Sequence, residues 1–537
     1  MKLLYKPKAF YLFFFAALLL NVTAGCKKGD PAEVPVVESE IKTPLDVAPS
    51  TGTRDQLTKD SIFLYARQVY LWWDLVPDYD TFKPRDYPNF DSELYAITRF
   101  GINPLTNKPY EFDEVNNNEP KYSYISDITQ KNPVAYVPEK KSSVDLDGNG
   151  NDFGLLLGVY GTKSSYTLSI KAIYPGSPAA RAGFKRGDRI TKINNKTFGS
   201  NYDAEINEIN TALFNSSSIR IAGFTSENVS FDRSLNTASY KSSPIYKDSV
   251  YTSGSKKIGY LAYARFSDGT NSYAEFDRIF SRFIQYGVTD LILDLRYNGG
   301  GYVTTAENLV NRIAPSSLNG KIMFTEYYNK LMQEGKATIL SKQALLKSDG
   351  TSQYQNGKLV TYADVDYSVK ANTNYFQKVG ALNNIASVVF IVSSSTASAS
   401  ELVINSLKPH MSVKIVGSTT YGKPVGFFPV RIDKYDVYFS MFETQNSKGE
   451  GKYYAGFTPD TGTSTADNDN VNYDFGDIRE SSFAAAYNFI TKGTYTSEVK
   501  SSGTIMSQKP EVSSSQSLHL DTEFKGMIKD PAKLKRK

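Results

Sequence analysis

Apolar runs and amphipathic segments alternate along the second half of the chain. Runs with the length and composition of buried strands lie at residues 257–266, 288–295, 386–392 and 413–417. The segment 271–286 repeats apolar residues at helical spacing, and a similar pattern follows Ala399. Because strands that alternate with helices usually form parallel sheets, we predict an α/β core over residues 250–495. The polar stretch 321–378 interrupts the alternation, and we interpret it as an insertion with a helix at 334–346.

The pattern before residue 250 is different. Helical spacing of apolar residues at 60–76 and 92–100 predicts a small N-terminal helical domain over residues 55–141. Residues 142–226 contain short strands separated by Gly and Pro turns, which is typical of a mainly β domain. The polar stretch 226–249 is expected to be a linker, so the chain is predicted to be a multidomain α/β protein.

The ends of the chain lack these patterns. Lysines precede an apolar run at residues 9–20 that is too short to span a bilayer comfortably. Thr-Ala-Gly-Cys at 23–26 resembles a bacterial lipobox, in which Cys26 becomes the lipidated first residue; a plain secretory signal is the alternative. We therefore expect a lipoprotein signal peptide at 1–25, a flexible tether at 26–54 and a disordered tail at 496–537.

Composition argues against several kinds of protein. The 537 residues include two His and one Cys, whereas zinc sites normally need several such ligands, and a single Cys excludes an intrachain disulfide. The acidic run 145–152 resembles the first half of a calcium-binding EF-hand loop, but Leu156 occupies the position of the closing Glu, so a turn is the better interpretation. The net charge of +5 without a concentrated basic face argues against nucleic-acid binding. We expect no metal and no cofactor.

A run of small hydroxyl residues, 393–400, lies between a predicted buried strand and a predicted helix. A serine there would lie beside the free N–H groups of a helix N-terminus, where a nucleophile and an oxyanion hole can be built together. The alternative is a Ser-rich turn that only caps the helix. The loops 296–301 and 418–425 also follow predicted parallel strands, so all these loops are expected to meet at the carboxyl edge of one sheet.

A serine nucleophile needs a base, and histidine is a poor candidate here. His410 lies about 18 Å along the helix from its start, at 1.5 Å per residue, and His519 lies in the predicted tail. Lys423 lies at the expected sheet edge, among Tyr421, Val425 and Phe427. A free lysine has a pKa of about 10.4, and apolar surroundings lower it. Lys423 is therefore the candidate general base.

The mainly β segment carries a recognisable motif. Residues 175–190 read PGSPAARAGFKRGDRI and are followed by Ile-Asn at 193–194, which resembles a PDZ domain of the bacterial protease-associated type. The resemblance implies binding of an extended chain end by strand addition, with backbone amides holding the terminal carboxylate. By the same resemblance, the carboxylate loop would be Phe153, Gly154 and Leu155.

The α/β segment carries an ordered set of motifs behind the PDZ-like segment. They are DLRYNGGG at 294–301, STASASE at 395–401, TYGKPVG at 420–426 and GFTPD at 456–460. Over about Asp55 to Ile490, this set resembles the S41 family of serine peptidases, the carboxy-terminal processing and tail-specific peptidases. The resemblance implies a core with the ClpP/crotonase fold. It assigns Ser398 as nucleophile, Lys423 as general base, and the amides of Ala399 and Gly300 as the oxyanion hole.

This sequence departs from the S41 pattern beside the lysine. Phe427 stands where processing peptidases commonly have a Gln that helps to orient the lysine, and Pro424 replaces a Gly. We expect a lipid-anchored serine endopeptidase of the bacterial cell envelope that acts on polypeptides through a Ser398–Lys423 dyad. One alternative is a non-catalytic peptide-binding lipoprotein in which the PDZ domain carries the function. The other is a crotonase-type acyl-CoA enzyme.

Overall fold

The computed structural model describes residues 42–44, 46–114, 116–129, 144–347, 350–460, 469–496 and 525–537. The predicted signal peptide at 1–25 and Cys26 lie outside the described residues, as does His519. In the part of the chain that the structure describes, no helix combines the length and the apolar character needed to cross a bilayer.

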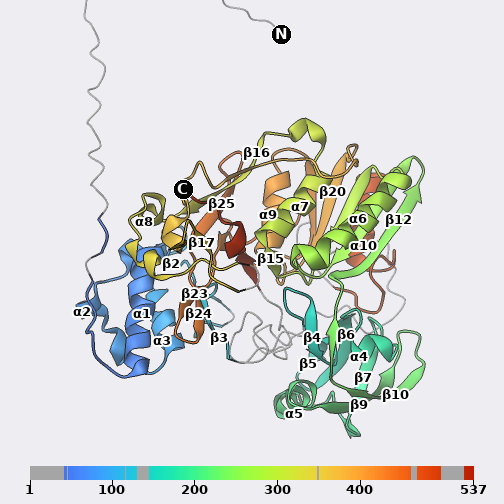
Figure 1. Ribbon diagram of the computed structural model, residues 1–537. Coiled ribbons are helices and arrows are strands. Elements are labelled where there is room, and N and C mark those ends of the chain that lie inside the picture. The colour runs from blue at the N-terminus through green and yellow to red at the C-terminus, as the bar shows by residue number, and fades with distance from the viewer. Residues whose placement is uncertain are drawn as a thin grey trace, which may run out of the picture. The chain divides into compact units, whose positions relative to one another are not determined.

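A five-stranded sheet in the order β12-β13-β14-β20-β21 lies at the centre of the α/β core (Figure 1). Its strands are β12 (Ile245–Ser253), β13 (Lys256–Tyr263), β14 (Asp290–Asp294), β20 (Ser387–Val392) and β21 (Ser412–Gly417). β12 runs antiparallel to β13, and the other neighbouring pairs are parallel. The predicted parallel strands are therefore confirmed.

Helices connect and cover these strands. They are α6 (Gly269–Gln285), α7 (Val303–Ile313), α9 (Ala399–Leu407) and α10 (Ser481–Lys492). α10 packs on β14, β20 and β21, where Phe483 and Ile490 share a buried cluster with Val389 of β20. α7 contacts both α6 and α9. The sheet is thus buried, and its loops at the carboxyl edge have a rigid base.

A second sheet has the antiparallel order β19-β16-β25-β22. Its strands are β16 (Ile322–Tyr328), β19 (Thr373–Tyr375), β22 (Val425–Gly426) and β25 (Phe442–Asn446). The predicted insertion 321–378 begins and ends with two of these strands, so its ends belong to the core. Between them lie α8 (Lys330–Gln333) and the hairpin of β17 (Tyr354–Gln355) and β18 (Lys358–Leu359).

The predicted helix at 334–346 is wrong. α8 ends before Gly335, which adopts a φ of +69°, and the chain continues as a short 3-10 turn at Thr338–Lys342. A glycine at positive φ is a common helix terminator, and it stops this helix where the polar pattern suggested one would begin.

The N-terminal segment contains the predicted helices but also joins the core. It comprises α1 (Arg54–Val69), α2 (Tyr79–Phe82), α3 (Phe90–Ile97), the pair β1 (Ile102–Asn103) and β2 (Lys108–Pro109), and β3 (Tyr124–Asp127). β3 pairs with β24 (Tyr435–Tyr438), which also pairs with β23 (Val430–Ile432). The segment is therefore not a separate helical domain, because its last strand completes a sheet of the core.

The prediction of a flexible tether is wrong for the described residues between 42 and 54. Thr53 caps α1, and the Asp46 carboxylate accepts hydrogen bonds from the Arg67 guanidinium and the Tyr79 N–H, both at 2.9 Å. The Thr43 hydroxyl donates to the Lys336 carbonyl at 2.7 Å. These contacts fix the segment on the folded unit.

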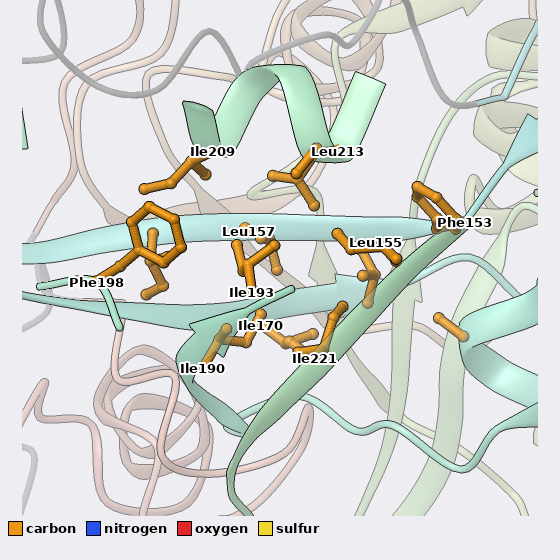
Figure 2. Close-up of a cluster of buried hydrophobic side chains, with 14 of the residues drawn as sticks. Phe153, Leu155, Leu157, Ile170, Ile190, Ile193, Phe198, Ile209, Leu213 and Ile221 are labelled. Carbon is orange, nitrogen blue, oxygen red and sulfur yellow. The ribbon is translucent and has the colours of Figure 1, made fainter. Parts of the chain in front are cut away.

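The mainly β segment forms a sheet in the order β10-β9-β7-β6-β5, with β8 paired to β7. Its elements are β5 (Leu155–Thr162), β6 (Ser165–Ile173), α4 (Pro178–Arg181), β7 (Arg189–Ile193), β8 (Lys196–Thr197), α5 (Tyr202–Phe214), β9 (Ser218–Phe224) and β10 (Ser230–Asn236). Figure 2 shows Ile209 and Leu213 of α5 packed over the sheet, facing Leu157 and Ile193.

The predicted linker 226–249 is wrong, and the PDZ boundary at 226 is too early. β10 completes the sheet, and β11 (Ala238–Lys241) pairs with β4 (Asn149–Asp152). Phe231 and Leu235 of β10 reach the buried cluster of this domain. This strand has only two large apolar residues, and its other residues are polar, so the hydrophobic pattern did not indicate a strand.

The predicted disordered tail is wrong for residues 525–537. β26 (Gly526–Ile528) pairs in parallel with β15 (Gly300–Tyr302), so the dark red end of the chain lies beside β15 (Figure 1). Met527 is fully buried, and Lys529 forms an ion pair with the buried Glu326 at 2.8 Å. A three-residue strand is too short for its periodicity to be detected, and it gains its stability from the core that it contacts.

Candidate active site

The loops that follow β14, β20 and β21 contact one another. The Ser400 hydroxyl donates to the Asn298 carbonyl at 2.9 Å, which joins the Ser-rich turn to the Gly run. The Tyr421 N–H donates to the Thr396 carbonyl at 2.9 Å, which joins the lysine loop to the same turn. The prediction that these loops meet at one edge of the sheet is therefore confirmed.

Ser398 lies directly before α9 in a strained backbone conformation. Its φ of 61° and ψ of −110° place a non-glycine residue at positive φ, which is uncommon and typical of functional turns. The side chain is fully buried, and its Oγ has no hydrogen-bond partner among the described residues. Ser398 thus has the sharp strand-to-helix turn expected of a nucleophile, in a closed environment.

Lys423 is buried at the tip of the neighbouring loop. Its Nζ donates to the Lys525 carbonyl at 2.9 Å and to the Tyr122 carbonyl at 3.3 Å. Burial lowers the pKa of Lys423 to about 7, because the ammonium loses its hydration; the charges of Lys121 and Lys525 act in the same direction, and Glu111 opposes them. An amine with this pKa is partly neutral at physiological pH and can accept a proton.

Phe427 contacts Lys423 through its ring. The Lys423 Nζ lies 4.4 Å from the centroid of the Phe427 ring, within the range of a cation–π contact. Phe427 is fully buried, so the ring is held in place. At the position where the S41 resemblance expects a Gln, the lysine thus contacts a buried aromatic face.

Glu401, which the sequence pattern did not single out, joins the Ser-rich turn to the lysine loop. Its Oε2 accepts the N–H groups of Ser398 and Lys423, each at 2.8 Å, and its Oε1 accepts the Gly422 N–H at 2.8 Å and the Thr420 hydroxyl. Burial raises the pKa of the carboxyl, while these bonds oppose the rise. A Glu three residues after a helix N-cap is a known capping position, which was the available signal.

A segment of the N-terminal region also surrounds the lysine. The Tyr122 hydroxyl donates to the Gly422 carbonyl at 2.5 Å. The buried Glu111 accepts the N–H groups of Tyr122 and Ser123, at 3.2 and 2.7 Å. This loop-rich segment has no periodic pattern, so nothing in the sequence connected it to the site.

The amides proposed for the oxyanion hole are close to each other. Ala399 is the first residue of α9, where helix N–H groups have no intrahelical partner. A methyl group added at Gly300 would lie 3.0 Å from the Ala399 nitrogen, so the two residues are in contact. The Gly300 N–H, however, donates to the Asn298 side chain at 2.9 Å. The donor role of Gly300 therefore stays a prediction that requires Asn298 to release this amide.

His410 lies in a different environment. Its Nε2 is 2.9 Å from the Ser447 hydroxyl, and its ring packs edge-on against Phe376. The structure thus provides no contact between His410 and the Ser-rich turn. Within the described ranges, no group of three or more His, Cys, Asp or Glu side chains is arranged to hold a metal ion.

The predicted carboxylate loop of the PDZ-like domain leads into β5, which forms one edge of the sheet. Gly154 has a φ of +79°, and its N–H donates to the Asp152 carboxylate at 2.8 Å. The Phe153 and Leu155 side chains belong to the buried core of the domain, so only their backbone could contact a peptide (Figure 2). The Phe153 carbonyl accepts the Ala179 N–H at 2.9 Å.

Comparisons with known proteins agree with both resemblances. Residues 257–462 match the model of peptidase family S41, and residues 169–207 match a PDZ domain model. A Staphylococcus aureus protein described as a CtpA-like serine protease is 23% identical over 297 residues, which are 55% of this chain and 49% of that protein. A carboxy-terminal-processing protease from Bartonella bacilliformis is 23% identical over 297 residues, 54% of this chain and 56% of that protein.

A solved structure shares the fold. A protein from Bacteroides fragilis, described as an S41 protease, aligns with 84% of this chain and 99% of its own chain, at 20% sequence identity and a TM-score of 0.52. In sequence, this chain matches about half the length of the curated relatives. In structure, the similarity to the Bacteroides fragilis protein covers most of this chain. Residues 257–462 are thus similar in sequence to peptidase family S41, and residues 169–207 are similar to a PDZ domain.

Proposed function

We propose that this protein is a serine endopeptidase that cleaves polypeptides with Ser398 as nucleophile and Lys423 as general base. The observation that carries the proposal is the Glu401 carboxylate, one oxygen of which accepts the backbone N–H groups of both Ser398 and Lys423. This shared acceptor fixes a serine on a strained turn next to a buried lysine with a pKa of about 7. Both residues are buried, and a neighbouring general base is what activates a serine nucleophile.

The proposed chemistry follows from these positions. The neutral Lys423 amine takes the proton from the Ser398 hydroxyl as Oγ attacks the carbonyl carbon of the substrate. The tetrahedral oxyanion accepts hydrogen bonds from the amide of Ala399 and from that of Gly300 once Asn298 has released it. Lys423 then donates its proton to the leaving amine, and the C–N bond breaks to give the acyl-enzyme. Lys423 then takes a proton from a water molecule whose oxygen attacks the acyl carbon. The C–Oγ bond breaks, the carboxylic acid product leaves, and Lys423 returns the proton to Ser398 Oγ.

The PDZ domain is proposed to present the substrate. Because β5 is the terminal strand of its sheet, an extended C-terminal segment could add beside it. Phe153, Gly154 and Leu155 would provide backbone groups for the terminal carboxylate. Unstructured C-terminal segments are therefore the proposed substrates.

The proposed location is the bacterial cell envelope, where a lipid on Cys26 would anchor the protein to a membrane. This part rests on the sequence alone: the charged start, the short apolar run and the lipobox-like residues 23–26. Labelling cells with a palmitate analogue should attach lipid to the wild-type chain and leave a Cys26→Ser variant unlabelled. Equal labelling of the two proteins would contradict the anchor.

The catalytic proposal is tested by incubating the purified protein with β-casein, an unfolded polypeptide, and identifying the products by mass spectrometry. Wild type should release peptides, while Ser398→Ala and Lys423→Ala should not. Ser395→Ala, a change in the same turn, should cleave like wild type. Unfolding curves identify any variant that has lost its fold. Cleavage by pure Ser398→Ala protein would overturn the assignment.

A further inference from the structure

We propose that the C-terminal strand of this chain, Lys525–Ile528, occupies the place of the polypeptide substrate and must leave before catalysis. The inference rests on the proposed function, because only a peptidase with Ser398 as nucleophile would bind a polypeptide substrate beside the Gly run. It names an intramolecular ligand of that site and the kind of chain that replaces it. The evidence comes from the contacts of the strand with the candidate catalytic groups.

The strand contacts the candidate base and the Gly run directly. The Lys525 carbonyl accepts a hydrogen bond from the Lys423 Nζ at 2.9 Å. The Gly526 N–H donates to the Gly299 carbonyl at 3.0 Å, and a methyl group added at Gly300 would lie 2.5 Å from the Gly526 carbonyl oxygen. The Lys525–Gly526 backbone therefore lies against the residues that the catalytic proposal requires.

The site is closed while the strand is in place. Ser398 and Ala399 are fully buried, and Lys423 is 1% exposed. The backbone of β15 is already paired with β26, and one edge of a strand can pair with only one other strand. A polypeptide cannot add to β15 and reach Ser398 while β26 stays in place.

On the side facing away from β15, β26 is also held by backbone hydrogen bonds. The Phe427 N–H donates to the Met527 carbonyl, and the Lys529 N–H donates to the Phe427 carbonyl, both at 3.0 Å. Strand β26 thus fits between β15 and Phe427 in a slot that is lined by main-chain groups. Such a slot accepts any extended chain, so main-chain pairing gives affinity without strong sequence selection.

Side chains of the segment add selectivity. Met527 is fully buried, so the slot includes an apolar site of about this size. Lys529 pairs with Glu326, which is fully buried. The inferred replacing substrate is an extended chain with a medium-sized apolar residue at the Met527 position and a basic residue two positions later.

An attached competitor has a high effective concentration, so it lowers the apparent affinity of the site for substrates in solution. Release of β26 would then set the rate of cleavage. A strand that is a permanent part of the fold would have no such effect. If β26 must leave, a covalent bond that holds it in place will stop catalysis. If β26 is a permanent part of the fold, the same bond will leave the rate unchanged.

A disulfide between β15 and β26 provides that lock. Tyr302 and Ile528 are cross-strand partners, and neighbouring strands lie about 4.8 Å apart, which suits a disulfide. The double variant Tyr302→Cys/Ile528→Cys is made in a Cys26→Ser background, because Cys26 is the single cysteine of the chain. The matched control Tyr302→Ser/Ile528→Ser receives the same oxidant.

Oxidation should lower the rate of β-casein cleavage by about tenfold or more, and dithiothreitol should restore it, since the locked strand holds the site in its closed state. The control variant should respond to neither reagent. Equal rates for the oxidised and reduced forms of the cysteine variant would overturn the inference.

Hydrogen exchange tests the inference without any activity. In full-length Ser398→Ala, addition of β-casein should speed the exchange of the amides of residues 526–529 and leave those of β20 unchanged. Unchanged exchange at 526–529 would overturn the inference. If the strand is displaced but no variant or wild type cleaves β-casein, the proposed activity fails and the binding inference stands.

Discussion

Lys423 occupies surroundings that favour its neutral form. Burial lowers its pKa to about 7, and the amine acts as a base only when it is unprotonated. We therefore predict that kcat/KM for cleavage rises with pH through an apparent pKa near 7. Below that value, the rate should fall by about tenfold for each pH unit, because the fraction of neutral lysine falls by that factor. Cleavage rates measured from pH 5 to 9 check this.

A Lys423→Arg variant is the natural comparison for this pH profile. Arginine stays charged over the whole range, so it should give no cleavage at any pH. A wild-type rate that does not change between pH 5 and 8, in a protein that stays folded over that range, would rule out a base with this pKa.

Glu401 is a positioning residue, because it acts through the backbone of Ser398 and Lys423. Glu401→Gln places an amide NH₂ against N–H donors and should lower kcat by about a hundredfold through misplacement of the reacting groups. It should also move the rising limb of the pH profile to lower pH, because the Glu401 charge raises the pKa of Lys423.

A purely structural role for Glu401 would lower stability without moving the pH profile. Thr420→Val, which removes only one of the hydrogen bonds to the carboxylate, provides the graded control and should have a smaller effect on kcat. The two variants are compared by full pH profiles and by unfolding curves.

At the scale of single residues, the scarcity of histidine and cysteine led to Lys423 as the base, and the resemblance to the S41 motifs selected Ser398 within the Ser-rich run. With two histidines and one cysteine in the chain, the order of strands and loops pointed to a serine and a lysine. Glu401 and Tyr122 were missed for different reasons. The position of Glu401 three residues after the helix N-cap indicates a capping role and does not indicate its contact with the Lys423 backbone. Tyr122 contributes its carbonyl, a group that every residue carries.

Among the elements, β10 decides where the PDZ domain ends. Leu235→Ala removes part of the buried cluster and should lower the free energy of unfolding by about 2–5 kcal/mol. Ser234→Ala on the exposed side of the same strand should change it by less than about 0.5 kcal/mol. Both values are measured by unfolding the full chain in urea and using hydrogen exchange of amides in the PDZ domain as the signal. Equal stabilities would mean that residues 226–249 act only as a linker.

Elements with long periodic patterns were predictable, and short ones were not. α6 and α10 and the parallel strands combine many apolar residues at regular spacing, so the sequence indicated them within a few residues. β3, β10 and β26 carry one to three core residues each and are stabilised by partners that are distant in the sequence. No local pattern can specify such pairings.

In the molecule as a whole, the surroundings of Lys423 come from three distant parts of the chain. Tyr122 belongs to the N-terminal segment, Glu401 and Phe427 to the core, and Lys525 to the C-terminal segment. The burial that lowers the lysine pKa therefore comes from all three parts of the chain while β26 is in place. The motifs pointed to the candidate residues, whereas their electrostatics became clear only from the structure.

The central claim, that Ser398 is the nucleophile of a peptidase, is tested most directly by covalent modification. The protein is treated with diisopropyl fluorophosphate, and β-casein cleavage is measured together with the fraction of modified Ser398 by mass spectrometry. We predict that activity and unmodified Ser398 decrease together, with no adduct in Ser398→Ala. Activity that persists when Ser398 is fully modified, or that is lost through an adduct on another residue, would contradict the claim.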